Sequence, residues 1–264
     1  MNMARVEYKY LVPKKELANL RDAIRSYVEL DDYIRPDDNE YRVHSIYFDT
    51  VSFAFYHEKM AGIQYRTKVR VRGYNEGGDD SPVFLEIKRK DDAMVSKHRA
   101  PVLFKHIDEL FKTRDIGRFV LNGNGNPRSH DDASRFFYQV YRHSLIPVVN
   151  VHYDREAYSY TFDRSVRITF DKNLRSTLHT GFGELFREDA SRPSLDGYFI
   201  LEVKYCDTFK GMPLWLEDIL GRFRLKRTAV SKYCICLEEN IVPGRTPSCG
   251  MFSSLPTGFS MKGL

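Results

Sequence analysis

The chain has 264 residues, of which 42% are hydrophobic and 29% charged, and its formal net charge is +5 at pH 7. This is the composition of an ordinary globular protein, long enough for one large domain or two small ones with a substantial core. The mild positive charge is compatible with an anionic ligand but does not by itself indicate nucleic acid or a membrane.

Cysteine usage and the N-terminus favour a cytoplasmic protein. The cysteines show neither the spacing of a zinc site nor a disulfide framework, which fits a reducing compartment. They are Cys206, Cys234, Cys236 and Cys249. The first residues, MNMARVEYKYLVP, contain no hydrophobic signal region. No apolar run approaches the roughly 18 residues of a membrane-spanning helix, so we expect no transmembrane segment.

Alternating, aromatic-rich or β-branched segments predict eight strands, and helical periodicity predicts four helices. In chain order they are strand Arg5–Val12, helix 13–30, strands Val43–Asp49, Tyr65–Tyr74, Val83–Arg89 and Val95–Pro101, helix 131–146, strands Val148–Tyr160, Val166–Phe170 and Tyr198–Tyr205, and helices 213–223 and 231–240. The stretch NGNGNPRSHDD predicts a loop. Residues 242–264 are rich in Gly, Ser and Pro, so we expect one domain over residues 1–241 and a flexible C-terminal tail.

Cations occupy every second residue of one predicted strand, in the stretch RTKVRVR. Successive side chains of a strand point to opposite faces, so the four cations would share one face and the two valines the other. The cations are Arg66, Lys68, Arg70 and Arg72. On an open sheet the charged face would be solvated, so the interpretation depends on the other strands.

The same spacing recurs elsewhere, with carboxylates among the cations. The residues are Glu7 and Lys9, Glu86 and Lys88, Lys97 and Arg99, Arg167, Thr169 and Asp171, and Glu202 and Lys204. A half-exposed antiparallel sheet also alternates charged and apolar residues, and Glu and Lys pair across strands. Because six strands share the pattern and use almost only Arg, Lys and Glu, we favour an α+β fold. It would contain a closed eight-stranded antiparallel β-barrel with a charged interior and helices packed on its outside.

Such an interior would contain more cations than carboxylates. The cations are Lys9, Arg66, Lys68, Arg70, Arg72, Lys88, Lys97, Arg99, Arg155, Arg167 and Lys204, and the carboxylates are Glu7, Glu86, Asp171 and Glu202. Unpaired cations are costly to bury dry, so this interior requires water and a polyanion. Arginine matches phosphate oxygens, and carboxylates suit phosphate-bound Mg²⁺ or Mn²⁺. The sequence therefore predicts a tunnel for a metal-bound triphosphate or a longer phosphate chain.

Eight short motifs point to a known family. They are VEYKY, HSIYFDT, KVRVRGY, FLEIKRK, YDREAY, VRITFDKNL, ILEVKY and SKY, and they run in order from Glu7 to Tyr233. The set resembles the VTC domain, the catalytic domain of the vacuolar transporter chaperone polyphosphate polymerase in the triphosphate tunnel metalloenzyme superfamily. The resemblance implies an eight-stranded antiparallel tunnel. It also implies transfer of the γ-phosphate of ATP to a growing polyphosphate chain, with Mn²⁺ or Mg²⁺ as cofactor and ADP as product.

The resemblance also implies roles for individual residues. The implied catalytic phosphate ligands are Lys9, Arg70, Arg72, Lys88, Arg155, Arg167 and Lys232. Further substrate-binding residues are Glu7, Lys97, Arg99, Tyr153, Lys204 and Ser231, while Arg66 and Lys68 rest on the alternation alone. Glu202 is the implied main metal ligand, with Glu7 and Glu86 as helpers.

One position departs from the family pattern. The polymerases carry a second lysine three residues before the lysine of SKY, and this chain has Ala229 there. Lys226 and Arg227 are the nearby cations that could replace it. The chain has the form expected of a compact prokaryotic member, for which a separate membrane protein would receive the product.

Other functions stay open at this point. The same tunnel could hydrolyse tripolyphosphate or a nucleoside triphosphate, or bind polyphosphate or a nucleotide without catalysis. An exposed basic sheet could instead bind nucleic acid, but that function would tolerate replacement of Glu86 and Glu202 and would depend steeply on salt. We favour ATP and polyphosphate as partners, with no nucleic acid.

The remaining candidates have structural interpretations. His44 and His152 lie in predicted strands without ligand spacing, and we favour structural roles for both. His98 should face away from its two cationic neighbours. Cys234 and Cys236 would not face each other on a helix, so we expect packing. Three aromatic residues could belong to the core or stack on an adenine, namely Phe53, Phe55 and Tyr56.

Overall fold

The computed structural model describes residues 5–31, 34, 39–91, 94–121, 128–179, 181–206 and 211–241. The predicted tail, 242–264, lies outside these ranges, as do Cys249 and residues 122–127 of the predicted loop. No helix within the described ranges is long and apolar enough to cross a membrane.

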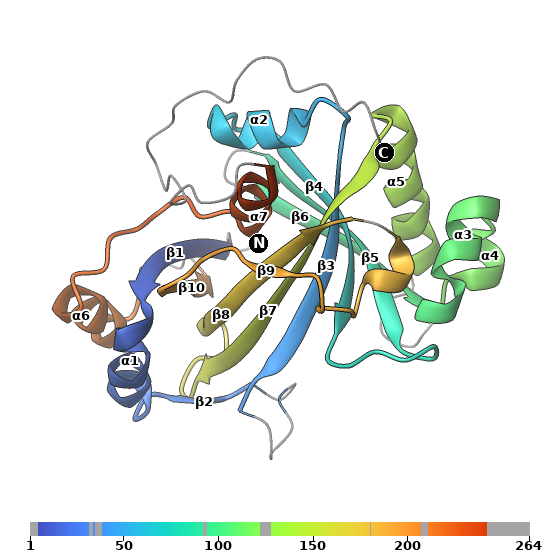
Figure 1. Ribbon diagram of the computed structural model, residues 1–264. Helices are drawn as coiled ribbons and strands as arrows, with labels where there is room; N and C mark the ends of the chain where they lie inside the picture. The colour runs from blue at the N-terminus through green and yellow to red at the C-terminus, as the bar shows by residue number, and fades with distance from the viewer. Residues whose placement is uncertain are drawn as a thin grey trace.

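Ten strands form one antiparallel sheet, and helices pack around it (Figure 1). The strands are β1 (Arg5–Pro13), β2 (Val28–Leu30), β3 (Tyr41–Asp49), β4 (Arg66–Tyr74), β5 (Pro82–Asp91), β6 (Met94–Leu103), β7 (Ile146–Tyr160), β8 (Arg167–Leu178), β9 (Arg192–Pro193) and β10 (Tyr198–Cys206). The helices are α1 (Leu17–Ile24), α2 (Ala54–Met60), α3 (Ile107–Thr113), α4 (Ile116–Phe119), α5 (Ser129–Arg142), α6 (Leu214–Arg222) and α7 (Lys232–Ile241), with 3₁₀ turns η1 (Lys14–Glu16), η2 (Phe104–His106) and η3 (Phe182–Glu184).

All eight predicted strands are present, and the differences concern short elements. The predicted helix over 13–30 ends at Ile24, because Val28–Leu30 leaves it and pairs with β7 as strand β2. Strand β9 and helices α2, α3 and α4 have two to seven residues, too few to show a periodicity in the sequence. Helix α5 begins at Ser129, so the end of the predicted loop is helical.

The prediction of a closed barrel is wrong. The strand order is β1-β10-β8-β7-β3-β4-β5-β6, and β1 does not pair with β6, so the sheet is open. The sheet nevertheless curls far enough to bring its two ends together. Lys88 of β5 donates a hydrogen bond to Glu7 of β1, with 2.7 Å between Nζ and Oε2. We call this contact the seam, because side chains rather than backbone hydrogen bonds join the two ends.

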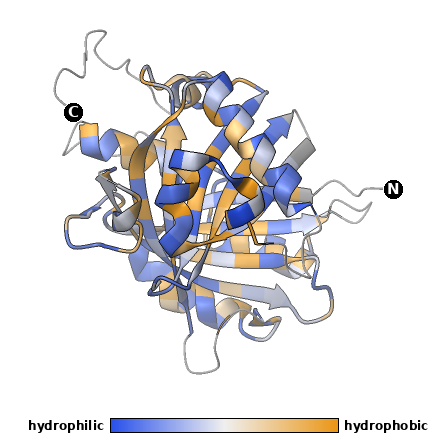
Figure 2. Ribbon diagram, turned by 90° about the vertical axis from the view of Figure 1, so that its right-hand side faces the viewer, coloured by the Kyte–Doolittle hydropathy of each residue, from blue (hydrophilic) through white to orange (hydrophobic). Residues whose placement is uncertain are grey.

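Much of the outer face of the sheet is apolar and covered by helices, as predicted, but at the centre of β3 and β7 it carries the buried polar residues His44 and His152. Helices α1 and α6 cover strands β1, β8 and β10, where Ile168, Phe170 and Val203 are buried. Helices α3, α4 and α5 cover β4, β5 and β6, where Val69 and Val71 have no exposed surface. The strands alternate between hydrophobic and hydrophilic residues along their length (Figure 2). Each buried valine contributes roughly 1.5–3 kcal/mol, so this packing fixes which face of β4 carries its cations.

Helix α7 packs on β7 and β8, and α2 packs on β4 and α7. The three aromatic candidates contribute to this packing: Phe55 and Tyr56 are buried in the core, and Phe53 packs against it. Cys234 and Cys236 are buried and unpaired, as expected for packing residues.

One buried carboxylate joins β3, α2 and α7. Asp49 is the last residue of β3 and has no exposed surface. Its carboxylate accepts hydrogen bonds from the backbone N–H groups of Thr50 (2.7 Å), Phe55 (2.9 Å) and Tyr56 (2.9 Å) and from the Tyr233 hydroxyl (2.5 Å). The N–H groups at the start of α2 are thereby satisfied, and α7 is held against the end of β3.

Replacing this carboxylate should destabilise the fold. We expect Asp49→Ala to lower the free energy of unfolding by about 3 kcal/mol, because buried donors lose a charged acceptor. Urea denaturation measures the change. Asp196→Ala is the matched control, because Asp196 is exposed and accepts from its neighbour Gly197; its effect should stay under about 0.5 kcal/mol. Equal effects of the two substitutions would contradict the assigned role.

Candidate functional site

The inner face of the curled sheet carries the charged residues that the alternation predicted. The register places Arg70 opposite Glu86, and Glu86 opposite Arg99. We define the inner face by its charged side chains. They are twelve cations (Lys9, Arg66, Lys68, Arg70, Arg72, Lys88, Lys97, Arg99, Arg155, Arg167, Lys204 and Lys232) and four carboxylates (Glu7, Glu86, Asp171 and Glu202). Lys232 comes from the start of α7, and the other fifteen come from strands.

Glu86 is the centre of one group of ion pairs. Its side chain is almost fully buried, and Oε2 accepts from Arg70 at 2.8 and 2.7 Å. Arg72 lies 3.9 Å from the same oxygen, while Lys97 and Arg99 lie 3.0 and 3.3 Å from Oε1. Burial alone would raise the pKa of Glu86, but Arg70 and Arg72 lower it well below its usual value. One permanently ionised carboxylate thus serves four cations.

Asp171 is the centre of a second group. It is buried and accepts two hydrogen bonds from Arg155, at 2.5 and 2.8 Å, and it also pairs with Lys232. The ring of Tyr153 lies beside both cations, 5.3 Å from the Arg155 guanidinium and 4.7 Å from Lys232 Nζ. This group joins strands β7 and β8 to the start of α7. The predicted residues Tyr153, Arg155 and Lys232 are therefore neighbours in the structure.

Glu7 and Glu202 belong to a third group. Lys9 lies 3.0 Å from Glu7 and 3.5 Å from Glu202, and Lys204 pairs with both carboxylates. Lys88 completes the group from across the seam. Burial would raise the pKa of Glu202, but Lys204 and Lys9 lower it well below its usual value. Both carboxylates are therefore ionised and held close together by shared lysines.

The arginines of β4 are also oriented by hydroxyl groups of β3 and β7. Arg70 donates to Tyr47 (3.0 Å), and Arg72 donates to Ser45 (3.1 Å) and Tyr153 (3.3 Å). The sequence analysis missed Tyr47 and Ser45. The alternation of side chains along HSIYF could have identified both residues, because Ser45 and Tyr47 are two positions apart and so share the inner face. Burial would raise the pKa of Tyr47, but Arg70 and Arg72 lower it to about 8.

Lys68 is placed beside α7. It donates to Ser231 Oγ at 3.1 Å, so the predicted substrate residue Ser231 does lie at this face. Burial, together with the nearby Lys9, lowers the pKa of Lys68 to about 8. This lysine loses its charge at a much lower pH than an ordinary lysine.

A lysine of α2 lies near Ala229, the position at which the family polymerases carry a second lysine. Lys59 donates to the carbonyl oxygen of Ala229 at 3.3 Å, and its pKa is lowered by burial and then by Arg66. Arg227 instead lies over the ring of Tyr8, 4.0 Å from its centroid. Lys59 is thus a further cation near Ala229, and nothing in the local sequence indicated it, because it comes from a distant helix.

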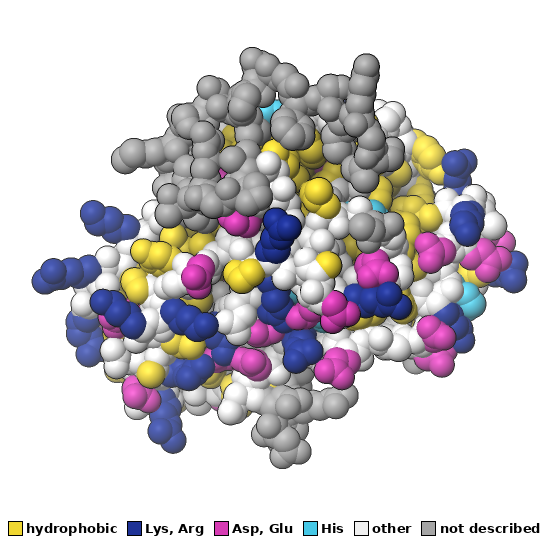
Figure 3. Space-filling model, viewed as in Figure 1, with side chains coloured by type: hydrophobic (Ala, Val, Ile, Leu, Met, Phe, Trp, Pro, Cys, Tyr) yellow, Lys and Arg dark blue, Asp and Glu magenta, His cyan; other side chains and the backbone are white. Residues whose placement is uncertain are grey.

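The remaining predicted cations lie toward the ends of the inner face. Arg167 Nε lies 2.9 Å from Asp31, and Arg66 faces Lys90 across the register and makes no ion pair within the described residues. His98 points away from the inner face and contacts Asp132 of α5 at 2.8 Å, as predicted. Lys and Arg are interspersed with Asp and Glu on the surface seen in Figure 3.

Two of the three predicted metal ligands belong to the same group of ion pairs. Glu7 and Glu202 offer ionised carboxylates joined through the same lysines. Such oxygen donors suit Mg²⁺ or Mn²⁺ that also binds phosphate. Glu86 lies in a different group, where four cations surround it. The residues present therefore fit a metal at Glu7 and Glu202, with Glu86 apart from it.

Comparisons with known proteins agree with the motifs. Vacuolar transporter chaperone complex subunit 4 of Trypanosoma cruzi (strain CL Brener) is 24% identical over 216 residues, covering 72% of this chain and 27% of that protein. The same subunit of Trypanosoma brucei brucei is 23% identical over the same shares. The chain thus spans only about a quarter of the length of these relatives.

Solved structures give weaker similarities. A Hippeastrum protein whose structure is described as revealing a dominant triphosphatase activity has a TM-score of 0.49 at 12% identity, covering 90% of this chain and 98% of that chain. A protein of Pyrococcus horikoshii OT3 has a TM-score of 0.44 at 14% identity, covering 89% of this chain and all of that one.

The family model carries more weight than these similarities. It matches residues 4–240, which contain all the charged residues of the inner face. It also spans the strands and helix that bring them together. The chain therefore belongs to the VTC domain family.

Proposed function

We propose that this protein is a polyphosphate polymerase that transfers the γ-phosphate of ATP to the end of a polyphosphate chain held on the inner face. The observation that carries the proposal is the charge of that face. Twelve cations face four carboxylates, of which Glu86, Asp171 and Glu202 are buried in ion pairs and Glu7 is paired but partly exposed. Such an excess of cations needs a counter-ion with many charges along its length, and polyphosphate has one on nearly every phosphate.

The proposed substrate would exchange partners with the existing ion pairs. Arg70, Arg72 and Arg155 present guanidinium groups that suit phosphate oxygens. When phosphate oxygens replace carboxylates at Lys9 and Lys204, Glu7 and Glu202 become available to hold Mn²⁺ or Mg²⁺. The metal would supply neutralisation of charge on the transferring phosphoryl group. The residues of the inner face would hold donor and acceptor phosphates in line, which is most of what phosphoryl transfer requires.

No enzyme nucleophile or strong base is needed. The attacking group would be a terminal phosphate oxygen, which is already anionic near neutral pH. The leaving group would be ADP, and Lys232 and Arg155, which pair with Asp171, would stabilise charge as the bond breaks. If water is excluded from the acceptor position, the γ-phosphate is transferred to polyphosphate. If water can enter that position, the same residues would catalyse hydrolysis.

The proposal also includes the partners of this chain and its location in the cell. The relatives are named as subunits of a chaperone complex. We propose that this chain acts in the cytoplasm and passes its product to a separate membrane protein. The cations face the interior of the curled sheet rather than an exposed surface, which supports polyphosphate over nucleic acid as the partner.

The first prediction from this proposal concerns products. Purified protein with ATP and Mn²⁺ should release ADP without matching free phosphate and form a polyphosphate ladder on a gel. Arg70→Ala should lower the rate about 100- to 1,000-fold, because a charge-stabilising donor is lost. Glu202→Gln should abolish the metal-dependent activity, because the main proposed metal ligand loses its charge. Arg187→Ala is the control, because Arg187 is exposed and pairs only locally with Glu184. Equal amounts of ADP and phosphate would instead identify a triphosphatase.

The second prediction concerns pH. Affinity for tripolyphosphate should fall as the pH rises through about 8, where Lys68 loses a positive charge and Tyr47 gains a negative one. The binding equilibrium should take up protons there, so affinity falls by up to about tenfold per pH unit for each group. Calorimetry of Lys68→Arg and Tyr47→Phe should show a shallower fall in each. Profiles identical to that of the unmodified protein would contradict the assignment.

A further inference from the structure

Two histidines meet on the face of the sheet opposite the charged residues. His44 of β3 and His152 of β7 are partners in the antiparallel register, and neither has more than 2% exposed surface. Their neighbours in sequence, Ser45 and Tyr153, point to the inner face. The segment between η3 and β9 crosses this outer face and brings Glu188 to the two rings.

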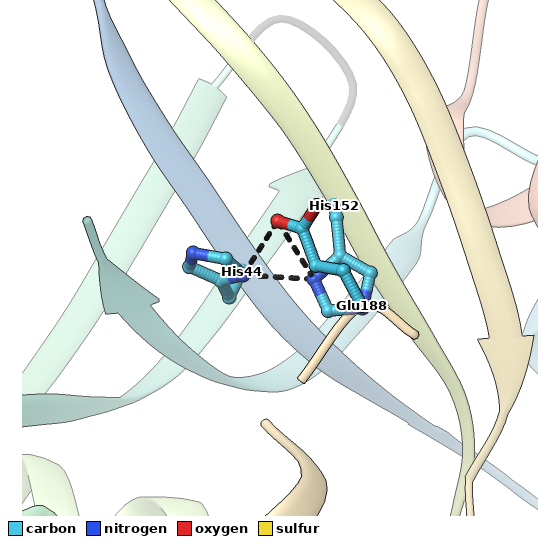
Figure 4. A group of neighbouring side chains, drawn as sticks. All are labelled: His44, His152 and Glu188. Carbon is cyan, nitrogen blue, oxygen red and sulfur yellow. Dashed lines mark hydrogen bonds and ion pairs between the residues drawn. The ribbon is translucent and has the colours of Figure 1, made fainter. Parts of the chain in front are cut away.

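The three side chains form a small triangle of metal-binding atoms (Figure 4). The Nδ1 atoms of His44 and His152 are 2.8 Å apart, and Glu188 Oε1 lies 3.7 and 4.0 Å from them. The point equidistant from three atoms at these separations is about 2.1 Å from each, which matches the length of a Zn–N or Zn–O bond.

The chemistry of the surroundings also favours a cation. Two nitrogens 2.8 Å apart cannot both carry a proton, so one Nδ1 donates a hydrogen bond to the lone pair of the other, and loss of that single proton would leave two nitrogen lone pairs for a metal ion. Glu188 Oε1 is buried and has no hydrogen-bond donor, whereas Oε2 accepts from Arg175 at 2.6 Å. Arg175 also binds Asp154, so two carboxylates share one guanidinium.

We propose that His44, His152 and Glu188 form a binding site for a first-row transition-metal dication such as Zn²⁺. Imidazole nitrogen with one carboxylate suits Zn²⁺, and much less Mg²⁺ or Ca²⁺. Arg175 would hold the carboxylate in position through its other oxygen, the usual task of an outer partner of a metal ligand. The site is separate from the inner face, where the candidate ligands are carboxylates alone.

The metal would attach the η3–β9 segment to the centre of the sheet. The same segment already packs Phe186 against two glycines, Gly73 and Gly77, where a Cβ atom would lie 2.5 and 2.2 Å from the ring. Phe186 also contacts the ring of His44 edge to face. A bound ion would add a second attachment two residues further along, and would stabilise the folded state by its binding free energy.

Equilibrium dialysis with Zn²⁺ tests the proposal, with excess Mg²⁺ present to occupy oxygen-only sites. The unmodified protein should retain one equivalent of zinc by metal analysis. Glu188→Gln should lower the affinity at least tenfold, because a charged ligand becomes a neutral amide. Glu184→Gln is the matched control in the same segment, where Glu184 pairs with Arg187, and should keep full affinity.

Two further measurements locate the ion. Glu202→Gln should retain the zinc, since Glu202 lies on the inner face. Co²⁺ in place of Zn²⁺ should give visible absorption bands that Glu188→Gln loses and Glu202→Gln keeps. Zinc retained by Glu188→Gln, zinc lost from Glu202→Gln, or no zinc bound to the unmodified protein would each overturn the site. Because these readouts do not use turnover, they are independent of the proposed polymerase.

Discussion

The inner face of the sheet depends on offsetting the electrostatic repulsion between its many cations. Each inner carboxylate is shared by at least two cations, and Glu86 is shared by four. A buried charge left without a partner costs several kcal/mol, so these shared ion pairs are what allow the cations to converge. They neutralise only part of the charge, and the surplus is available to a polyanion. The same arrangement therefore accounts for both folding and the proposed binding.

The seam follows from the same constraint. Strand β1 and the β5–β6 end of the sheet are joined through Lys88 and Glu7 rather than by backbone pairing. Backbone closure would fix the spacing of the inner face, whereas an ion pair can exchange partners. If phosphate binds Lys88 and a metal binds Glu7, the proposed substrate itself would connect the two ends of the sheet. An open sheet is thus consistent with the long phosphate chain that we propose as substrate.

The sequence predicted the strands and the sheet face of the candidate charged residues. Alternate residues of a strand share a face even when the predicted ends of the strand are wrong by a few residues. The prediction that the sheet closes was wrong, since closure depends on twist and curl accumulated over eight strands. Lys59 reaches Ala229 from a separate helix, a contact across 170 residues. His44 and His152 are 108 residues apart. Contacts of this kind have no signal in local spacing, so residues that meet through tertiary packing were missed.

Strand β3 connects the two faces. Its alternation gives Ser45 and Tyr47 to the inner face, where they orient Arg72 and Arg70, and gives His44 to the outer face. A metal held by His44 would restrict the backbone at the residue next to Ser45. Because the position of Ser45 orients the Arg72 guanidinium, an ion on the outer face would make the arrangement of phosphate-binding groups more rigid without contacting them. The outer site would thus act on the inner face through the pleat of a single strand.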